Sequence, residues 1–325
     1  MLSVVVPMFN EIESLPHFAS RLRPILEALP VPYEVVCVDD GSTDGTAGAL
    51  LAMQELWAEL RVVRLRRNAG HQRALTAGLD HARGDWIVSI DADLQDPPEV
   101  IPQMLSVAID SGVDVVYGVR SDRTSDTRFK RGTATIYYKA MHRAAGVEIP
   151  HHAGDFRLLS RRAVAEVARL PERERVYRLL IPYMGFRSAE VPYRRDARVA
   201  GKSKYPVRKM AKLAVESYTS FTTAPLRFAT WMGLVGFVLC SAFAIVSLVA
   251  YFVGATVPGW TSFAIVLGFI GAVQFFFLGL LGEYVARVYT EIQGRPRYFA
   301  EPEPESSPAA MRSGTRDDIQ ATERP

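Results

Sequence analysis

A run of 55 residues without a charged or histidine side chain, 228–282, limits the folds open to this chain. A helix needs about 20 apolar residues to cross the hydrocarbon core of a bilayer. The run is long enough for two such helices, and Pro258 and Gly259 break it near its middle, beside Trp260. The sequence therefore predicts transmembrane helices over 228–253 and 261–282. A buried hairpin of a soluble protein is disfavoured because its helices would normally keep a polar face.

Basic residues lie on both sides of the apolar run. Since cytoplasmic loops carry an excess of Lys and Arg, both chain ends are predicted to face the cytoplasm of a multi-pass plasma-membrane protein, with the 254–260 turn outside. The basic segment 206–227 is predicted to be a juxtamembrane amphipathic segment that attracts anionic lipid. Residues 298–325, with "EPEPESSPAA", are expected to form a disordered tail. The basic residues are Arg194, Arg195, Arg198, Lys202, Lys204, Arg208, Lys209, Lys212 and Arg227 before the run, and Arg287, Arg295 and Arg297 after it.

Residues 1–205 show an alternation of short apolar runs with stretches long enough for helices. This alternation is typical of an α/β domain with a mainly parallel sheet. No cleaved signal peptide is expected, because the first residues resemble a strand rather than a basic segment followed by a long apolar one. The predicted strands are 2–6, 33–38, 61–65, 85–90 and 114–119. The predicted helices are 11–28, 44–59, 70–83 and 98–110.

Polar clusters follow three of these predicted strands: "PMFNE" (7–11), "DDGSTDGT" (39–46) and "DADLQD" (91–96). Ligands of open α/β sheets bind beyond the carboxyl ends of the strands, where these clusters should meet. Carboxylates gathered there repel one another unless a cation or ligand donors compensate. Asp91 and Asp93 project to the same side of an extended segment and can face one Mg²⁺ or Mn²⁺ ion that bridges a diphosphate. The alternative for such a pair is a solvated turn before the next helix.

Other features exclude some classes of function. The net charge of +3 is too small to indicate nucleic-acid binding. Cys37 and Cys240 lie in apolar runs without a spacing typical of a metal site or disulfide framework, so both are expected to fill space. Five histidines, His71, His81, His142, His151 and His152, are expected at the surface or in supporting positions. Of these, His151 and His152 precede Asp155 closely in the chain.

Four segments together carry a resemblance to a known family: "VVVPMFNE", "VVCVDDGSTDGT", "RNAGHQRALTAGLDHARGDWIVSIDADLQDPPE" and "GDFRLLSR". They resemble family 2 of the glycosyltransferases, which have the GT-A nucleotide-sugar fold. Within that family the chain is most similar to the polyprenyl-phosphate glycosyltransferases, the dolichyl-phosphate mannose synthase-like and bacterial undecaprenyl-phosphate glucosyltransferase-like group. The match runs in order from about residue 2 to 205, and two C-terminal membrane helices suit the bacterial branch.

The resemblance implies a role for individual residues of the donor site. Family members often carry Tyr where Phe9 stands, a difference that removes a hydroxyl but keeps a stacking face. The residues implied to bind the nucleotide sugar are Pro7, Phe9, Asn10, Glu11, Asp39, Asp40, Asp91, Ala92 and Gln95. Those implied to hold the divalent ion are Asp91, Asp93 and Gln95.

On the acceptor side, Asp155 resembles the aspartate between donor sugar and acceptor, and it is expected to be catalytic together with Asp93. A phosphomonoester acceptor has a second pKa of about 6, so it is already nucleophilic at neutral pH and needs cations more than a general base. The resemblance places its phosphate among Arg120, Arg131, Arg198, Ser203 and Lys204. Arg208, Lys209 and Lys212 are instead expected to face anionic lipid.

The sequence thus predicts inverting transfer of a hexose from a UDP- or GDP-linked sugar to undecaprenyl or another polyprenyl phosphate at the cytoplasmic leaflet. A processive polysaccharide synthase is an alternative, but it usually carries a Gln-x-x-Arg-Trp motif and more spans. A non-catalytic membrane tether that binds nucleotide sugar or anionic lipid is another. A nucleotidyltransferase would need a Gly-rich loop where "PMFNE" stands. The sugar, and whether the spans pack as a dimer or tetramer, stay open.

Overall fold

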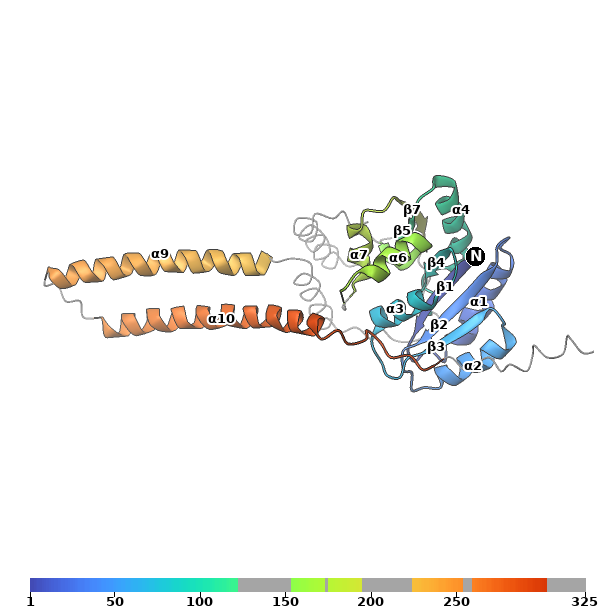
Figure 1. Ribbon diagram of the computed structural model, residues 1–325, viewed down its shortest axis with the longest axis horizontal. Coiled ribbons are helices and arrows are strands. Elements are labelled where there is room, and N and C mark those ends of the chain that lie inside the picture. Colours follow the sequence, from blue (N-terminus) through green and yellow to red (C-terminus); the bar gives the residue numbers. More distant parts are fainter. Residues whose placement is uncertain (122–152, 173–174, 195–223, 254–258, 303–325) are drawn as a thin grey trace, which may run out of the picture.

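The computed structural model describes residues 1–121, 153–172, 175–194, 224–253 and 259–302. An α/β domain lies at one end of the molecule, and a pair of long helices extends away from it (Figure 1). Four parallel strands follow the predicted alternation: β1 (Leu2–Met8), β2 (Tyr33–Asp39), β3 (Leu60–Arg64) and β4 (Trp86–Ser89). The helices between them are α1 (Leu15–Glu27), α2 (Thr46–Leu56) and α3 (His71–His81).

The sheet has seven strands in the order β3-β2-β1-β4-β6-β5-β7. β6 (Ala153–Ser160) is antiparallel to both its neighbours, β4 and β5 (Val115–Arg120), while β7 (Ser188–Tyr193) pairs with β5 in parallel. The remaining helices in the described part of the domain are the short η1 (Pro98–Val100), α4 (Ile101–Ser111), α6 (Arg161–Arg169) and α7 (Tyr177–Tyr183). The mainly parallel sheet is confirmed, and the antiparallel β6 brings Asp155 next to the end of β4.

Two apolar cores cover the two faces of the sheet, because successive side chains of a strand point to opposite faces. Val4 and Val6 belong to the core that includes Phe18 and Leu50 of α1 and α2, whereas Val5 belongs to the core formed with α3, α6 and α7. α3 packs tightly on β1: a Cβ atom at Gly78 would lie 2.2 Å from Val5 Cγ1. This close packing fixes the N-terminus of α3 at the carboxyl edge of the sheet.

The apolar run forms two helices, α9 (Ala224–Phe252) and α10 (Trp260–Ile292), that run side by side (Figure 1). Among the described residues, one segment, Phe269–Ile292, is long and apolar enough to cross a membrane. The helix α10 includes the second predicted span, 261–282, and continues past Gly282 to Ile292. Nothing in the sequence stops it before Gly294, which has a φ of +58°, and Pro296.

The predicted tail also needs correction at its start. Residues 298–301 are not a free tail: Arg66 N–H donates to Phe299 O at 2.9 Å, and Glu301 N–H donates to Arg64 O at 2.8 Å. These residues therefore extend the edge of the sheet at β3. The remainder of the predicted tail, 303–325, and most of the predicted juxtamembrane segment, 206–223, lie outside the described residues.

Candidate functional site

The loops that follow β1 and β2 interlock at the carboxyl edge of the sheet. Asn10, with a φ of +55°, donates its N–H to Ser42 Oγ at 2.9 Å and accepts the Thr43 N–H on Oδ1 at 2.8 Å. Glu11 N–H donates to Thr46 Oγ1 at 2.9 Å, and the Glu11 carboxylate accepts from a neighbouring serine hydroxyl. Residues 7–11 and 39–46 therefore form one structured surface.

Along this surface, Pro7 is buried in β1 while Phe9 is 37% exposed. The two aspartates at the end of β2 have different surroundings. Asp39 is buried and accepts the Ser42 N–H on Oδ1 at 3.1 Å. Asp40 accepts the N–H groups of Ala69 and Gly70 at 2.6 and 2.9 Å, so it fixes the loop that leads into α3.

The acidic segment after β4 is shaped by two local contacts. Asp93 Oδ1 accepts the Gln95 N–H at 3.1 Å, and Leu94 between them has a φ of +55°. Asp96 is buried, accepts a hydrogen bond from the Tyr193 hydroxyl, and lies 3.8 Å from Arg120 Nη2. β7 thus supplies a hydrogen-bond donor to Asp96, and β5 supplies a nearby positive charge.

His71, the first residue of α3, lies between Asp91 and Asp155. Its Nε2 atom is 3.4 Å from Asp155 Oδ2 and 3.9 Å from Asp91 Oδ1. Desolvation opposes the charged imidazole, but the hydrogen bond with Asp155 and the charges of Asp91 and Asp155 raise the pKa of His71 to about 9. At neutral pH the fold therefore holds a cation between two carboxylates.

Asp155 has a second cationic neighbour in Arg157, which is 1% exposed. Arg157 Nη2 lies 2.5 Å from Asp155 Oδ1 and also donates to Gly154 O at 3.0 Å. Desolvation alone would raise the pKa of Asp155, but the His71 hydrogen bond and the charge of Arg157 outweigh it and lower this pKa below its ordinary value. Asp155 is consequently ionised and fixed in orientation.

Asp91 behaves differently from Asp155. Desolvation, together with the charges of Asp155, Asp93 and Asp96, raises the pKa of Asp91 to about 6, although His71 opposes the shift. The negative charge near Asp91 is therefore only partly compensated within the chain. A divalent cation would complete that compensation, and carboxylate oxygens are its preferred ligands.

The donor set fits such an ion chemically, but it does not form a closed protein cage. No group of three or more His, Cys, Asp or Glu residues is placed to hold a metal ion in the part of the chain that the structure describes. Mg²⁺ usually binds through one or two carboxylates and substrate phosphates. The arrangement of Asp91 and Asp93 suits that mode, in which the diphosphate completes the coordination.

The described part of the chain brings some of the expected site residues together, and other expected residues lie outside it. The loops gather Asp91, Ala92, Asp93 and Gln95 after β4, next to Asp155 of β6. Arg120 ends β5 and has its Nε atom 3.4 Å from the Tyr193 hydroxyl. The other acceptor-side residues lie outside the described residues: Arg131, Arg198, Ser203 and Lys204.

His71 and Arg157 were not among the expected site residues. His71 is expected at the surface or in a supporting position, and the structure instead places it between two acidic residues of the site. Its position in the chain offered one signal: it opens the helix after β3 and therefore lies at the ligand-binding edge. The signal for Arg157 was weaker: it lies two residues after Asp155 on the same strand, so the two side chains point to the same face of the sheet.

Comparisons with known proteins found related sequences and solved structures. Over 92% of this chain it is 40% identical to the SfII prophage-derived bactoprenol glucosyl transferase of Shigella flexneri, of which 96% is covered. It is 38% identical to the uncharacterized glycosyltransferase sll0501 of Synechocystis, with 92% of this chain and 94% of that protein covered. A solved structure, glucosyl-3-phosphoglycerate synthase of Mycobacterium tuberculosis, superposes with a TM-score of 0.49 at 20% identity over 66% of this chain and 75% of that one.

The described sheet carries its acidic residues at the edge where nucleotide-binding α/β folds bind ligands. Residues 3–168, which span this sheet from β1 through β6, match glycosyl transferase family 2. Given the extent of this match and the relatives at about 40% identity, the chain belongs to glycosyl transferase family 2 and is a glycosyltransferase enzyme with a GT-A-like fold.

Proposed function

We propose that this enzyme transfers glucose, with inversion, from a nucleoside diphosphate to a polyprenyl phosphate at the cytoplasmic face of a membrane. The observation that carries the proposal is the 40% identity, over 92% of the chain, with proteins named bactoprenol glucosyl transferase. The geometry of the site supports it, because an ionised Asp155 and a partly compensated acidic segment lie together at the carboxyl edge of the sheet.

In this proposal the nucleotide lies on the interlocked loops after β1 and β2. Phe9 offers an exposed ring for stacking, and the buried Asp39 carboxylate accepts hydrogen bonds from the base. Pro7, Asn10 and Glu11 shape the loop, and Asp40 holds the segment before α3 through two backbone amides. Ala92, which is buried, is proposed to line the donor site.

Asp91, Asp93 and Gln95 would hold the divalent ion, Mg²⁺ or Mn²⁺, together with the diphosphate. When bound, the ion supplies positive charge to the departing nucleoside diphosphate. The backbone supports this assignment, because the Asp93–Gln95 hydrogen bond of 3.1 Å fixes the turn in which the donors lie. His71 supplies further positive charge on the side that faces Asp155.

The acceptor phosphate makes a general base unnecessary, since it is ionised at neutral pH. Asp155 then has an orienting and electrostatic role beside the donor sugar, and His71 and Arg157 fix its two oxygen atoms. Arg120, at the end of β5, is proposed to bind the acceptor phosphate with Arg131, Arg198, Ser203 and Lys204.

We also propose that α9 and α10 both span the bilayer and keep the catalytic domain at the interface, where the lipid phosphate lies. Two observations support this: most of each helix lies within the uncharged run 228–282, and Phe269–Ile292 has the length and apolar character of a span. The lipid tail can then stay in the bilayer while its phosphate reaches the sheet edge.

The proposal is tested with purified protein, Mn²⁺ or Mg²⁺, UDP-glucose and undecaprenyl phosphate. The expected product is undecaprenyl-phosphate glucose, identified by mass spectrometry. UDP-mannose, UDP-N-acetylglucosamine and GDP-mannose serve as competing donors. A non-catalytic tether would bind a donor without releasing free nucleotide, and a polysaccharide synthase would yield products with several sugars.

A further inference from the structure

The chain after α10 returns to the α/β domain as an extended segment, residues 293–301, which we call the C-terminal strap (Figure 1). It pairs with the chain at the end of β3 through two backbone hydrogen bonds, from Arg66 N–H to Phe299 O and from Glu301 N–H to Arg64 O. Leu65 and Ala300 face each other as an antiparallel bridge. The strap is therefore an added edge of the sheet at the nucleotide side.

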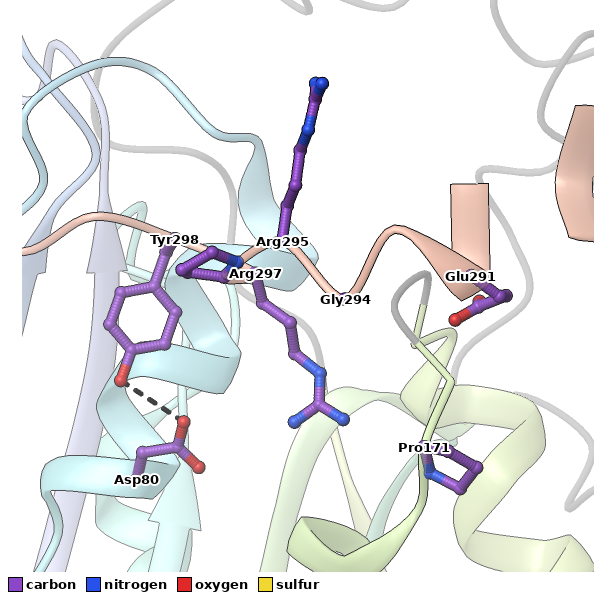
Figure 2. A pocket seen from close by; sticks show the side chains of 8 residues that line it. Asp80, Pro171, Glu291, Gly294, Arg295, Arg297 and Tyr298 are labelled. Atoms are coloured by element: carbon purple, nitrogen blue, oxygen red, sulfur yellow. Dashed lines mark hydrogen bonds between the residues drawn. The ribbon is translucent and has the colours of Figure 1, made fainter. Parts of the chain in front are cut away.

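Side chains of Arg297 and Tyr298, in the middle of the strap, also attach it to the α/β domain. Figure 2 shows the Tyr298 hydroxyl directed at Asp80 of α3, 3.2 Å from Oδ2, and Arg297 reaching between Asp80 and Pro171. Arg297 Nη2 donates to Leu170 O at 2.6 Å. The cavity of about 520 Å³ beneath this segment is bounded by Asp80, Pro171, Glu291 and the strap itself. The strap thus connects the end of α10 to α3 and to β3.

The last described contact of the strap leads into the proposed nucleotide site. Glu301 Oε2 lies 2.9 Å from Arg64 Nη1, and Arg64 Nε lies 4.0 Å from Asp39 Oδ2. Arg64 and Asp39 are register partners on β3 and β2, so their side chains lie next to each other on one face. Among the described residues, Arg64 Nε is buried without a hydrogen-bond partner.

Arg64 therefore lies between two carboxylates, Asp39 and Glu301, that have different roles. In the proposed function Asp39 accepts a hydrogen bond from the nucleotide base. Its Oδ1 atom already accepts the Ser42 N–H, so Oδ2 is the oxygen that must stay available, whereas Glu301 has no proposed role in contacting the donor. With Glu301 present, Arg64 Nη1 is ion-paired with Glu301 Oε2, and Arg64 Nε stays at 4.0 Å from Asp39 Oδ2. Without that partner, it can move onto Asp39 and compete with the base, because arginine and carboxylate pair strongly at hydrogen-bond distance.

We propose that Glu301 is a positioning residue for nucleotide binding, which acts by holding the Arg64 guanidinium away from the carboxylate of Asp39. This inference rests on the proposed function, in which Asp39 binds the base. The loop after β3 supports the coupling, because it packs against the nucleotide loop: a Cβ atom at Gly41 would lie 2.6 Å from Asn68 N. The strap thus connects the membrane helices to donor binding.

The test measures UDP binding by calorimetry with the full-length protein in lipid nanodiscs. Glu301→Gln should raise the Kd for UDP by about two- to fivefold, the range expected for a half-exposed ion pair. The turnover at saturating UDP-glucose and the KM for the lipid acceptor should stay unchanged. Glu301→Asp should retain most of the affinity, since it keeps the charge. Glu27→Gln, which removes an exposed ion pair to Arg23 far from the site, is the matched control.

A double-mutant cycle separates this role from a merely structural one. If Glu301 acts through Arg64, Glu301→Gln should have no further effect on the Kd in an Arg64→Ala protein. An undiminished effect in that background, or an unchanged Kd for Glu301→Gln alone, would overturn the role of Glu301 while leaving the proposed function intact. Failure of the wild-type protein to bind any nucleoside diphosphate would overturn both.

Discussion

His71 Nε2 lies 3.4 Å from Asp155 Oδ2, a contact that joins the first turn of α3 to the strand β6. Asp155 Oδ1 is held at the same time by the buried Arg157. The carboxylate therefore has one orientation, with a cation on each oxygen. In the proposed reaction, this oriented carboxylate and its two cationic partners give the site fixed charges beside the donor sugar and the departing diphosphate.

The first prediction concerns this pair. His71→Ala should lower turnover by on the order of 10²-fold, because Asp155 loses a partner and the site loses a positive charge. The Kd for UDP should change little. Asp155→Asn should have a similar effect, and the double variant should be no worse than the more damaging single one, as expected for residues that act as a unit. Additive losses in single-turnover kinetics would show that the two act separately.

The second prediction concerns the divalent ion. Asp93→Asn should reduce turnover by on the order of 10²-fold or more while the fold and membrane insertion persist, because a metal and diphosphate contact is lost. Asp110→Asn, on the exposed face of α4, is the matched control and should be silent. EDTA should abolish transfer, and Mn²⁺ or Mg²⁺ should restore it. Full activity in EDTA would show that transfer does not need a divalent metal ion.

The third prediction concerns the acceptor. Arg198→Ala and Lys204→Ala should each weaken acceptor binding by about 1.5–3 kcal/mol, the cost of losing a charge-assisted contact. The loss should appear in the KM for the polyprenyl phosphate, with the KM for the donor unchanged. Lys209→Ala, expected to face lipid, should be nearly silent. An unchanged acceptor KM in both variants would exclude this phosphate site.

The fourth prediction concerns orientation in the membrane. A cysteine at Thr256 should react with a membrane-impermeant thiol reagent in intact cells, and one at Ser307 should react only after lysis, because the basic flanks predict that both ends face the cytoplasm. Cys240 is replaced by Ser in both proteins, and Cys37 is buried. The reverse pattern would place the catalytic domain outside, away from cytoplasmic nucleotide sugars.

Local sequence patterns predicted much of the α/β fold. Strands such as Leu2–Met8, in which Ser3 is the one polar residue, are nearly continuous apolar runs because both faces of a parallel sheet are buried. The acidic segment 91–96 was recognisable because it follows such a strand directly. The order of the strands was not predictable, since the antiparallel position of β6 depends on contacts between distant segments.

The missed residues share one cause. His71 becomes a site residue only when α3 packs on β1 and β6 pairs with β4, so no spacing in the sequence brings it near Asp155. Residues 298–301 were expected to be part of a disordered tail because of their composition. Their order comes from backbone pairing with the end of β3 and from Arg64, neither of which a composition reveals.

The most direct measurement is transfer itself. Purified protein with Mn²⁺, UDP-glucose and either undecaprenyl phosphate or undecaprenol is incubated, and the lipids are identified by mass spectrometry. The account predicts a single glucose added to the phosphorylated lipid, with UDP released in equal amount, and no product from undecaprenol. Glucosylation of undecaprenol as fast as of the phosphate, or UDP release without any glycolipid, would contradict it.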